Sequence, residues 1–132
     1  YMLENAKILN IGSMSSFEPI PYINVYASSK AFVLSFSRAL GRELKPLGIH
    51  VMCVCPGWIK TEFQEKANHF KYVKFVNRWY EASQVASQTI KDFKKKRKIS
   101  ILGLPVRVQV ILVKFLPIDI IMKIWCKQQG IK

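Results

Sequence analysis

The chain has 132 residues, enough for one small domain, and half of them are hydrophobic, which predicts a packed core and argues against disorder. The 21 Lys and Arg residues outnumber the 8 Asp and Glu residues and give a net charge of +13. No uncharged stretch reaches the roughly 18–20 apolar residues that a membrane-spanning helix needs.

The positive charge is concentrated in the second half of the chain. Residues 66–132 hold 15 of the 21 Lys and Arg and 3 of the 8 Asp and Glu, and Lys94–Lys98 is an unbroken basic run. This asymmetry favours either a basic surface for phosphates, nucleic acid or anionic lipid, or a solvated helix end. No zinc-finger, helix-turn-helix or RNA-binding signature supports nucleic acid, which is therefore disfavoured as a partner. An anionic membrane surface stays open.

The first half of the chain predicts a strand, a helix and a second strand. Lys7–Ile11 is apolar enough for a short buried strand, and residues 12–16 predict a loop. A helix is expected from Asn24, a suitable N-cap, to a stop at Pro46. Residues 49–55, rich in β-branched side chains, predict the second strand. Spacings of three and four residues place five side chains on one face of this helix: Tyr26, Lys30, Val33, Phe36 and Leu40.

The second half continues the alternation. Residues 61–80 are polar and aromatic and predict short helices, residues 81–95 predict a longer helix, and Ile99–Leu102 predicts a third short strand. Pro117 divides the tail into two amphipathic stretches. In the second stretch a polar stripe of Asp119, Lys123 and Lys127 is expected opposite Ile120, Ile121, Ile124 and Trp125.

Strands that alternate with helices of this length predict an α/β fold with a parallel sheet. Parallel sheets are normally buried on both faces, and three strands make a narrow one. The chain is therefore expected to form part of a wider sheet.

The three cysteines do not predict a disulfide framework. Cys53 and Cys55 alternate within the second predicted strand, and Cys126 is distant in sequence. No second Cys or His pair stands at ligand spacing, so we interpret Cys53 and Cys55 as small buried residues and predict no metal site. An odd cysteine count without a secretion signal predicts a reducing compartment, the cytoplasm.

Tyr26 and Lys30 place a phenol and an ammonium four residues apart, on one face of the predicted helix. A neighbouring cation favours the phenolate form of a tyrosine. Ser13 stands just past a predicted strand, where its hydroxyl could donate to a substrate oxygen. Together the three groups could polarise a carbonyl and pass it a proton. Taken alone, a Tyr-x-x-x-Lys pair is more often a surface aromatic–cation contact.

Three segments then follow one another in a recognisable order: Ile-Leu-Asn-Ile-Gly-Ser at residues 8–13, Tyr-Ala-Ser-Ser-Lys at 26–30 and Val-Cys-Pro-Gly-Trp-Ile-Lys-Thr at 54–61. They resemble the motifs of the short-chain dehydrogenase/reductase family. The resemblance implies a doubly wound parallel sheet of Rossmann type that uses NAD or NADP. It also implies a homo-oligomer formed through the helix that carries Tyr26 and Lys30. The implied catalytic residues are Ser13, Tyr26 and Lys30, and the implied cofactor contacts are Tyr26, Lys30, Pro56, Gly57, Ile59 and Thr61.

In that mechanism a hydride passes between NAD(P)H and a ketone or alcohol. Tyr26 exchanges a proton with the substrate oxygen, Lys30 holds the nicotinamide ribose and Ser13 orients the carbonyl.

Two departures from the family pattern stand out. Gly12 replaces the first Ser of the usual Asn-x-Ser-Ser, a change expected to affect the geometry of the turn more than the chemistry. No two of the six glycines are closer than seven residues, so no glycine-rich phosphate loop can be built from this chain. The chain is therefore expected to be the C-terminal portion of one catalytic domain, inactive alone. Residues 1–61 would form the catalytic strand-helix-strand, 62–97 the lid and a helix, and 98–132 the last strand and amphipathic tail.

Few residues of the sequence indicate the substrate class. The predicted lid contains Phe63, Phe70, Tyr72, Phe75, Trp79 and Tyr80, which either line an apolar pocket or pack the lid itself. His69 could touch substrate or stay exposed. The branch that acts on steroids and 3-oxoacyl chains is the most similar. The alternative to an enzyme is an inactive truncated relative that serves as a dimerisation or membrane-surface module.

Overall fold

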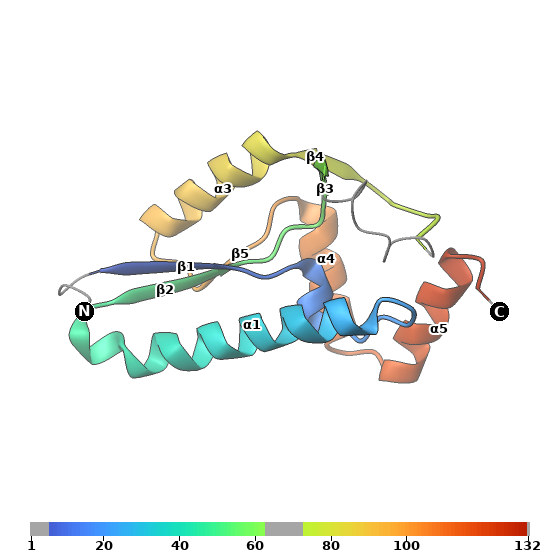
Figure 1. Ribbon diagram of the computed structural model, residues 1–132, viewed down its shortest axis with the longest axis horizontal. Coiled ribbons are helices and arrows are strands. Elements are labelled where there is room, and N and C mark those ends of the chain that lie inside the picture. The colour runs from blue at the N-terminus through green and yellow to red at the C-terminus, as the bar shows by residue number, and fades with distance from the viewer. Residues whose placement is uncertain (1–5, 63–72, 132) are drawn as a thin grey trace.

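A computed structural model describes residues 6–62 and 73–131 of the protein, and its centre is a parallel three-stranded sheet (Figure 1). Strands β1 (Lys7–Ile11), β2 (His50–Val54) and β5 (Ile99–Ser100) lie in the order β1-β2-β5. The central strand β2 pairs with β1 along its whole length, and its last two residues pair with β5. The predicted α/β fold with parallel strands is confirmed.

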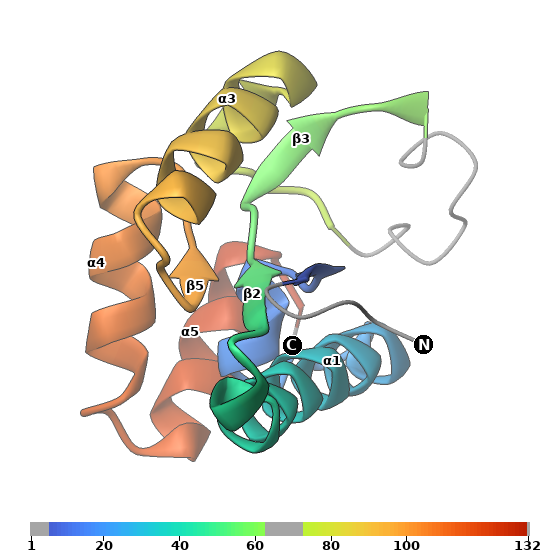
Figure 2. The same ribbon diagram turned by 90° about the vertical axis from the view of Figure 1, so that its left-hand side faces the viewer.

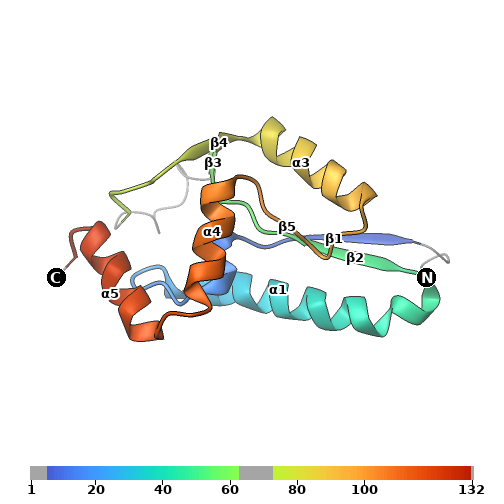
Figure 3. The same ribbon diagram turned by 180° about the vertical axis from the view of Figure 1, so that it is seen from behind.

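Helices cover both faces of this sheet and one of its ends. The 20-residue helix α1 (Asn24–Glu43) lies on one face, and α3 (Ala82–Lys94) lies on the other (Figure 2). Helices α4 (Leu104–Val113) and α5 (Ile118–Gln128) lie beyond the carboxyl ends of the strands (Figure 3). This arrangement surrounds the carboxyl edge of the sheet with the first turns of α1 and with the tail helices.

The core is densest around β2. Cys53 and Cys55 are fully buried and pack against Leu34 of α1. Strand β1, in contrast, leaves Leu9 44% and Ile11 63% exposed. An apolar strand with one open face agrees with the prediction that these strands belong to a wider sheet.

The predicted cap of the first helix is wrong. Asn24 is the first residue of α1, its Oδ1 atom accepts from the adjacent Val25 N–H at 2.8 Å, and Ile23 takes the cap position. The buried positions of α1 are Ala27, Leu34 and Ser37, whereas Phe36 is exposed and stacks on Phe32 with ring centroids 6.0 Å apart.

The predicted loop over residues 12–16 contains a 3-10 helix, η1 (Met14–Phe17), and a second one, η2 (Lys45–Leu47), follows α1 before Gly48 turns the chain at a φ of 69°. A parallel pair of short strands, β3 (Trp58–Lys60) and β4 (Trp79–Glu81), was not predicted. The short helices expected over residues 61–80 are absent from residues 73–78, and residues 63–72 lie outside the described part of the chain.

The third strand is shorter than predicted because Ile101 leaves the ladder. Its carbonyl oxygen accepts a hydrogen bond from the Arg107 Nε–H at 2.9 Å, and Gly103 then turns the chain into α4 at a φ of 88°. In α5 the polar stripe is exposed as expected and Ile121 is buried, but Ile120 and Ile124 are exposed. No helix within the described ranges is both long and apolar enough to span a membrane.

Candidate active site

The site forms where β1 and β2 end, because the carboxyl ends of adjacent parallel strands open onto one crevice. Backbone hydrogen bonds continue the pairing past the strands. The Gly12 N–H donates to the Val54 carbonyl at 2.8 Å, and the Met14 N–H donates to the Pro56 carbonyl at 2.8 Å. The loop after β1 is therefore fixed against the Pro56-Gly57 segment after β2.

Ser13 is buried, with 7% of its surface exposed, and caps η1. Its Oγ atom accepts from the Ser15 N–H at 3.1 Å and donates to Ser15 Oγ at 3.2 Å. The Ser13 N–H donates to Ser16 Oγ at 3.2 Å. The backbone of Ser13 is thus held rigidly, while its hydroxyl proton can turn from Ser15 to a substrate oxygen.

Tyr26 and Lys30 occupy the first two turns of α1, and the Lys30 ammonium lies 5.7 Å from the centre of the Tyr26 ring. Lys30 Nζ also donates to the Ile11 carbonyl at 3.2 Å. The Ser16 hydroxyl donates to the Lys30 carbonyl at 2.8 Å, which ties α1 to the loop that carries Ser13. The helix and both strand ends therefore fix the lysine beside the phenol.

A cavity of about 240 Å³ opens among these groups. Every residue predicted for the site lines it: Ser13, Tyr26, Lys30, Pro56, Gly57, Ile59 and Thr61. The structure therefore brings together residues that are up to 48 positions apart in the sequence. Their individual roles stay predictions.

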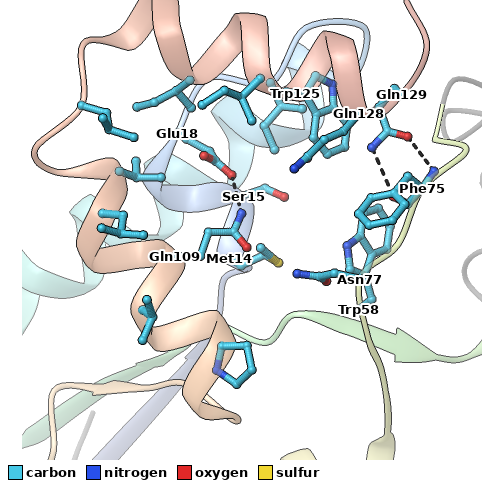
Figure 4. Close-up of a pocket in the computed structure, with 18 of the residues that line it drawn as sticks. Met14, Ser15, Glu18, Trp58, Phe75, Asn77, Gln109, Trp125, Gln128 and Gln129 are labelled. Carbon is cyan, nitrogen blue, oxygen red and sulfur yellow. Dashed lines mark hydrogen bonds between the residues drawn. The ribbon is translucent and has the colours of Figure 1, made fainter.

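A second, larger cavity of about 680 Å³ adjoins the first, and Met14, Ser15 and Trp58 line both (Figure 4). Its other walls come from α4, α5 and the segment around Phe75 and Asn77. Most of the lining is aliphatic or aromatic. Five further polar side chains interrupt it: Glu18, Asn77, Gln109, Gln128 and Gln129.

The described aromatic residues of the predicted lid have different surroundings. Phe75 lines the larger cavity, whereas Trp79 packs edge-on against Trp58 with ring centroids 5.9 Å apart. Tyr80 is buried and lines neither cavity. Phe63, His69, Phe70 and Tyr72 lie outside the described residues.

Sequence reasoning missed several residues of the site. Trp58 lies inside the Pro-Gly motif and Met14 follows Ser13, so their place beside the named residues could have indicated them. Glu18 and Gln109 are hydrogen-bonded across 91 positions of sequence, and no local pattern points to that pair.

Gly12, the departure from the family motif, sits against the two strand cysteines. A Cβ atom there would lie 3.0 Å from Cys53 Sγ and 3.3 Å from Cys55 Sγ, so the packing favours glycine. The hydrogen bond with Cys53 and burial both raise the pKa of the Cys55 thiol. The three cysteines are free, and the described residues hold no group of three His, Cys, Asp or Glu side chains that could bind a metal.

Residues 1–71 match the family described as short chain dehydrogenase. The chain belongs to the short-chain dehydrogenase family. It is 49% identical over 54 residues to a very-long-chain 3-oxoacyl-CoA reductase of Phaeosphaeria nodorum, across 41% of this chain and 16% of the relative. It is 38% identical over 88 residues to D-xylose 1-dehydrogenase of Caulobacter vibrioides, across 64% of this chain and 31% of the relative. The chain therefore spans less than a third of either of these short-chain dehydrogenases.

Among solved structures, the short-chain dehydrogenase of Sphingobium yanoikuyae in complex with NADPH shares 28% identity. It superposes with a TM-score of 0.65, over 80% of this chain and 41% of that one. A short-chain dehydrogenase of Burkholderia cenocepacia in complex with NADP is 16% identical with a TM-score of 0.68, over 87% of this chain and 46% of that one, and shows the shared fold. The predicted family and the predicted Rossmann-type sheet are confirmed.

The smaller cavity has the donors that the nicotinamide end of such a cofactor requires. An ammonium group has three N–H donors. Lys30 donates one hydrogen bond to the Ile11 carbonyl, which leaves two donors for ribose hydroxyls. Thr61 and residues 56–59 line the same cavity. These residues fit a nicotinamide nucleoside.

Proposed function

We propose that this chain supplies the catalytic residues of an NAD(P)-dependent oxidoreductase that interconverts a ketone and an alcohol. The observation that carries the proposal is the shared cavity, in which Ser13, Tyr26 and Lys30 meet beside the Pro56–Thr61 segment. Membership in the family supports it. The chain spans only part of its relatives, so the proposal concerns the complete gene product.

When bound, the nicotinamide supplies or accepts the hydride. The Ser13 hydroxyl donates a hydrogen bond to the substrate carbonyl and fixes its orientation. Tyr26 gives its phenolic proton to the carbonyl oxygen during reduction and takes it back during oxidation. Lys30, held over the Tyr26 ring, favours the negative charge that develops on the phenol oxygen and holds the nicotinamide ribose.

We propose an apolar substrate body. The larger cavity adjoins the catalytic one, and its walls are chiefly aliphatic and aromatic side chains of α4 and α5. A lining of this kind stabilises bound apolar groups by removing them from water. The 49% identity to a very-long-chain 3-oxoacyl-CoA reductase supports the same substrate class.

The test is spectrophotometric. The complete gene product is mixed with NADH or NADPH and a panel of aliphatic and polycyclic ketones, and loss of reduced cofactor is followed. We expect turnover with at least one cofactor, and a preference for apolar ketones over aldoses. Consumption of neither cofactor with any ketone, by a protein that is folded, would contradict the proposal.

We also propose that the outer face of α1 pairs with a second copy. Phe32 is 69% and Phe36 49% exposed, and they form a stacked apolar ridge with Val25, which is 81% exposed, on the same helix. Exposed apolar patches of this kind mark interfaces. Replacing Phe32 and Phe36 by Ser should shift the sedimentation coefficient of the complete protein from oligomer to monomer, and an unchanged coefficient would contradict the proposal.

A further inference from the structure

A carboxyl group, the one ionisable side chain among the described lining residues, stands in the largely apolar larger cavity. Glu18 follows the last residue of η1, and its Oε1 atom accepts a hydrogen bond from Gln109 Nε2 of α4 at 3.2 Å (Figure 4). Across residues 6–62 and 73–131 this is the one hydrogen bond to the carboxyl group, and no Lys or Arg forms an ion pair with it. The carboxyl group therefore retains acceptor capacity that faces the cavity.

The placement of the Glu18 carboxyl group in this cavity lowers the stability of the fold. Burial raises the pKa of the Glu18 carboxyl, and the hydrogen bond from Gln109 only partly opposes that rise. A carboxyl group in an apolar cavity with one amide partner is poorly satisfied, whereas a leucine at this position would simply extend the apolar wall. Poorly satisfied ionisable groups in a cavity are candidates for ligand recognition.

The separation of Glu18 from Ser13 determines how far a substrate must extend to contact both residues. Ser13 and Glu18 flank η1, and a 3-10 helix rises about 2 Å per residue, so their backbones lie on the order of 10 Å apart. Met14 and Ser15, between them, line both cavities. A substrate whose carbonyl lies at Ser13 can therefore extend past Met14 and bring its far end to Glu18.

We propose that Glu18, positioned by Gln109, selects substrates that carry a hydroxyl group at the end remote from the reacting carbonyl. The proposal rests on the function proposed above. A hydroxyl at that end donates to the free carboxyl oxygen. A methyl group leaves the acceptor unpaired, and a carboxylate is repelled by the charge of Glu18.

The experiment compares two ligands that differ in one group: a long-chain methyl ketone with a terminal hydroxyl, and its deoxy analogue of equal length. Binding to the complete gene product is measured through tryptophan fluorescence, because Trp58 and Trp125 both line the cavity. We expect the hydroxyl ligand to bind roughly tenfold more tightly or better, as for a hydrogen bond to a charged group.

Three variants identify the residue responsible. Glu18→Leu should abolish the preference. Glu18→Gln keeps the size and an acceptor oxygen, so the preference should fall without vanishing, and this variant also serves if Glu18→Leu does not fold. Gln128→Leu is the matched control, because Gln128 is an exposed polar residue that lines the same cavity away from the Glu18–Gln109 pair, and it should keep the full preference.

Turnover of the same two ketones separates this inference from the proposed function. Equal affinity of the wild-type protein for both ligands, or a preference that survives both Glu18 substitutions, would overturn the assignment of Glu18, even if both ketones are reduced. Discrimination by Glu18 in binding without any cofactor oxidation would support that assignment and contradict the proposed reaction.

Discussion

The Tyr26 hydroxyl is the group proposed to give its proton to the substrate oxygen. Tyr26→Phe keeps the ring over which Lys30 Nζ lies at 5.7 Å, and the hydrogen bond from Lys30 to the Ile11 carbonyl does not involve Tyr26. The position of the lysine and the start of α1 should therefore be preserved. Any large change in rate then reports the loss of the proton donor.

The expected loss is large. General acid catalysis contributes roughly 10²–10⁴ in rate, which corresponds to about 3–5 kcal/mol of transition-state stabilisation. Loss of one ordinary hydrogen bond to a bound ligand is worth only about 1 kcal/mol. A proton donor and a merely binding hydroxyl are thus distinguishable by the size of the effect on kcat.

The assay measures kcat and the cofactor Kd of the complete gene product on one ketone. We expect kcat of Tyr26→Phe to fall by about a hundredfold or more, with the cofactor Kd within about twofold of wild type. Tyr22→Phe is the control, because Tyr22 is 52% exposed and lines neither cavity, and its kcat should not change. If Tyr26→Phe kept more than about a tenth of wild-type kcat, the assignment of Tyr26 as the proton donor would be wrong.

Three further changes test other parts of the molecule. Lys30→Ala removes both the cation over Tyr26 and the ribose donor, so it should lower kcat and weaken cofactor binding together; an unaltered cofactor Kd would exclude the ribose contact. Asp92→Asn should lower the free energy of unfolding by about 1–3 kcal/mol at neutral pH, because the 2%-exposed carboxylate accepts from Ser100 Oγ at 2.8 Å and pairs with Arg97 at 3.2 Å. Burial alone would raise the pKa of Asp92, but hydrogen bonds from Gln88 and Ser100, together with the charges of Arg97 and Arg107, outweigh it and hold the pKa below its ordinary value. The Asp92 carboxylate thus contributes its full stabilisation above the pKa that Asp92 has in the unfolded chain, and this stabilisation is lost as the pH falls through the lower pKa of the folded state. Urea titrations should show the unfolding free energies of wild type and Asp92→Asn converging below about pH 4, and a difference that stays constant with pH would contradict this. Gly12→Ser should cost about 1–3 kcal/mol through overpacking against Cys53, and Cys53→Ala in the same chain should recover part of that loss in thermal denaturation; no loss in the single variant would refute the packing argument.

The elements that depend on a short-range sequence pattern could be predicted from the sequence. Lys7–Ile11 was predicted with its observed bounds because an apolar run next to Gly12 has few alternatives. For the same kind of reason the predicted bounds of α3 are within one residue at each end, and α1 ends at Glu43, three residues before the predicted stop at Pro46, since periodicity and terminal residues mark both helices. Spacing alone does not say which face of a helix packs on the sheet, and the stacked pair Phe32 and Phe36 of α1 is exposed.

Long-range features escaped prediction. Strands β3 and β4 pair residues about 20 positions apart, and neither segment alternates clearly enough to indicate a strand. The placement of Ser13, Tyr26, Lys30 and the Pro56–Thr61 segment around one cavity was expected from the family motifs. The wall formed by α4 and α5 could not be expected, because only the folded chain brings Gln109 to Glu18.

Gln129, at the end of α5, makes hydrogen bonds of the kind a neighbouring strand would make. Its Oε1 atom accepts from the Lys74 N–H at 2.7 Å and the Phe75 N–H at 2.8 Å, and its Nε2 atom donates to the Phe75 carbonyl at 3.1 Å. One buried side chain thus substitutes for an edge strand, and it ties the Phe75 wall of the cavity to the tail. For protein engineering, residues 73–77 and 118–129 form one exchangeable unit. A chimera that takes its tail from another family member without the matching 73–77 segment would leave two part-buried N–H groups without a partner, at about 1–3 kcal/mol each.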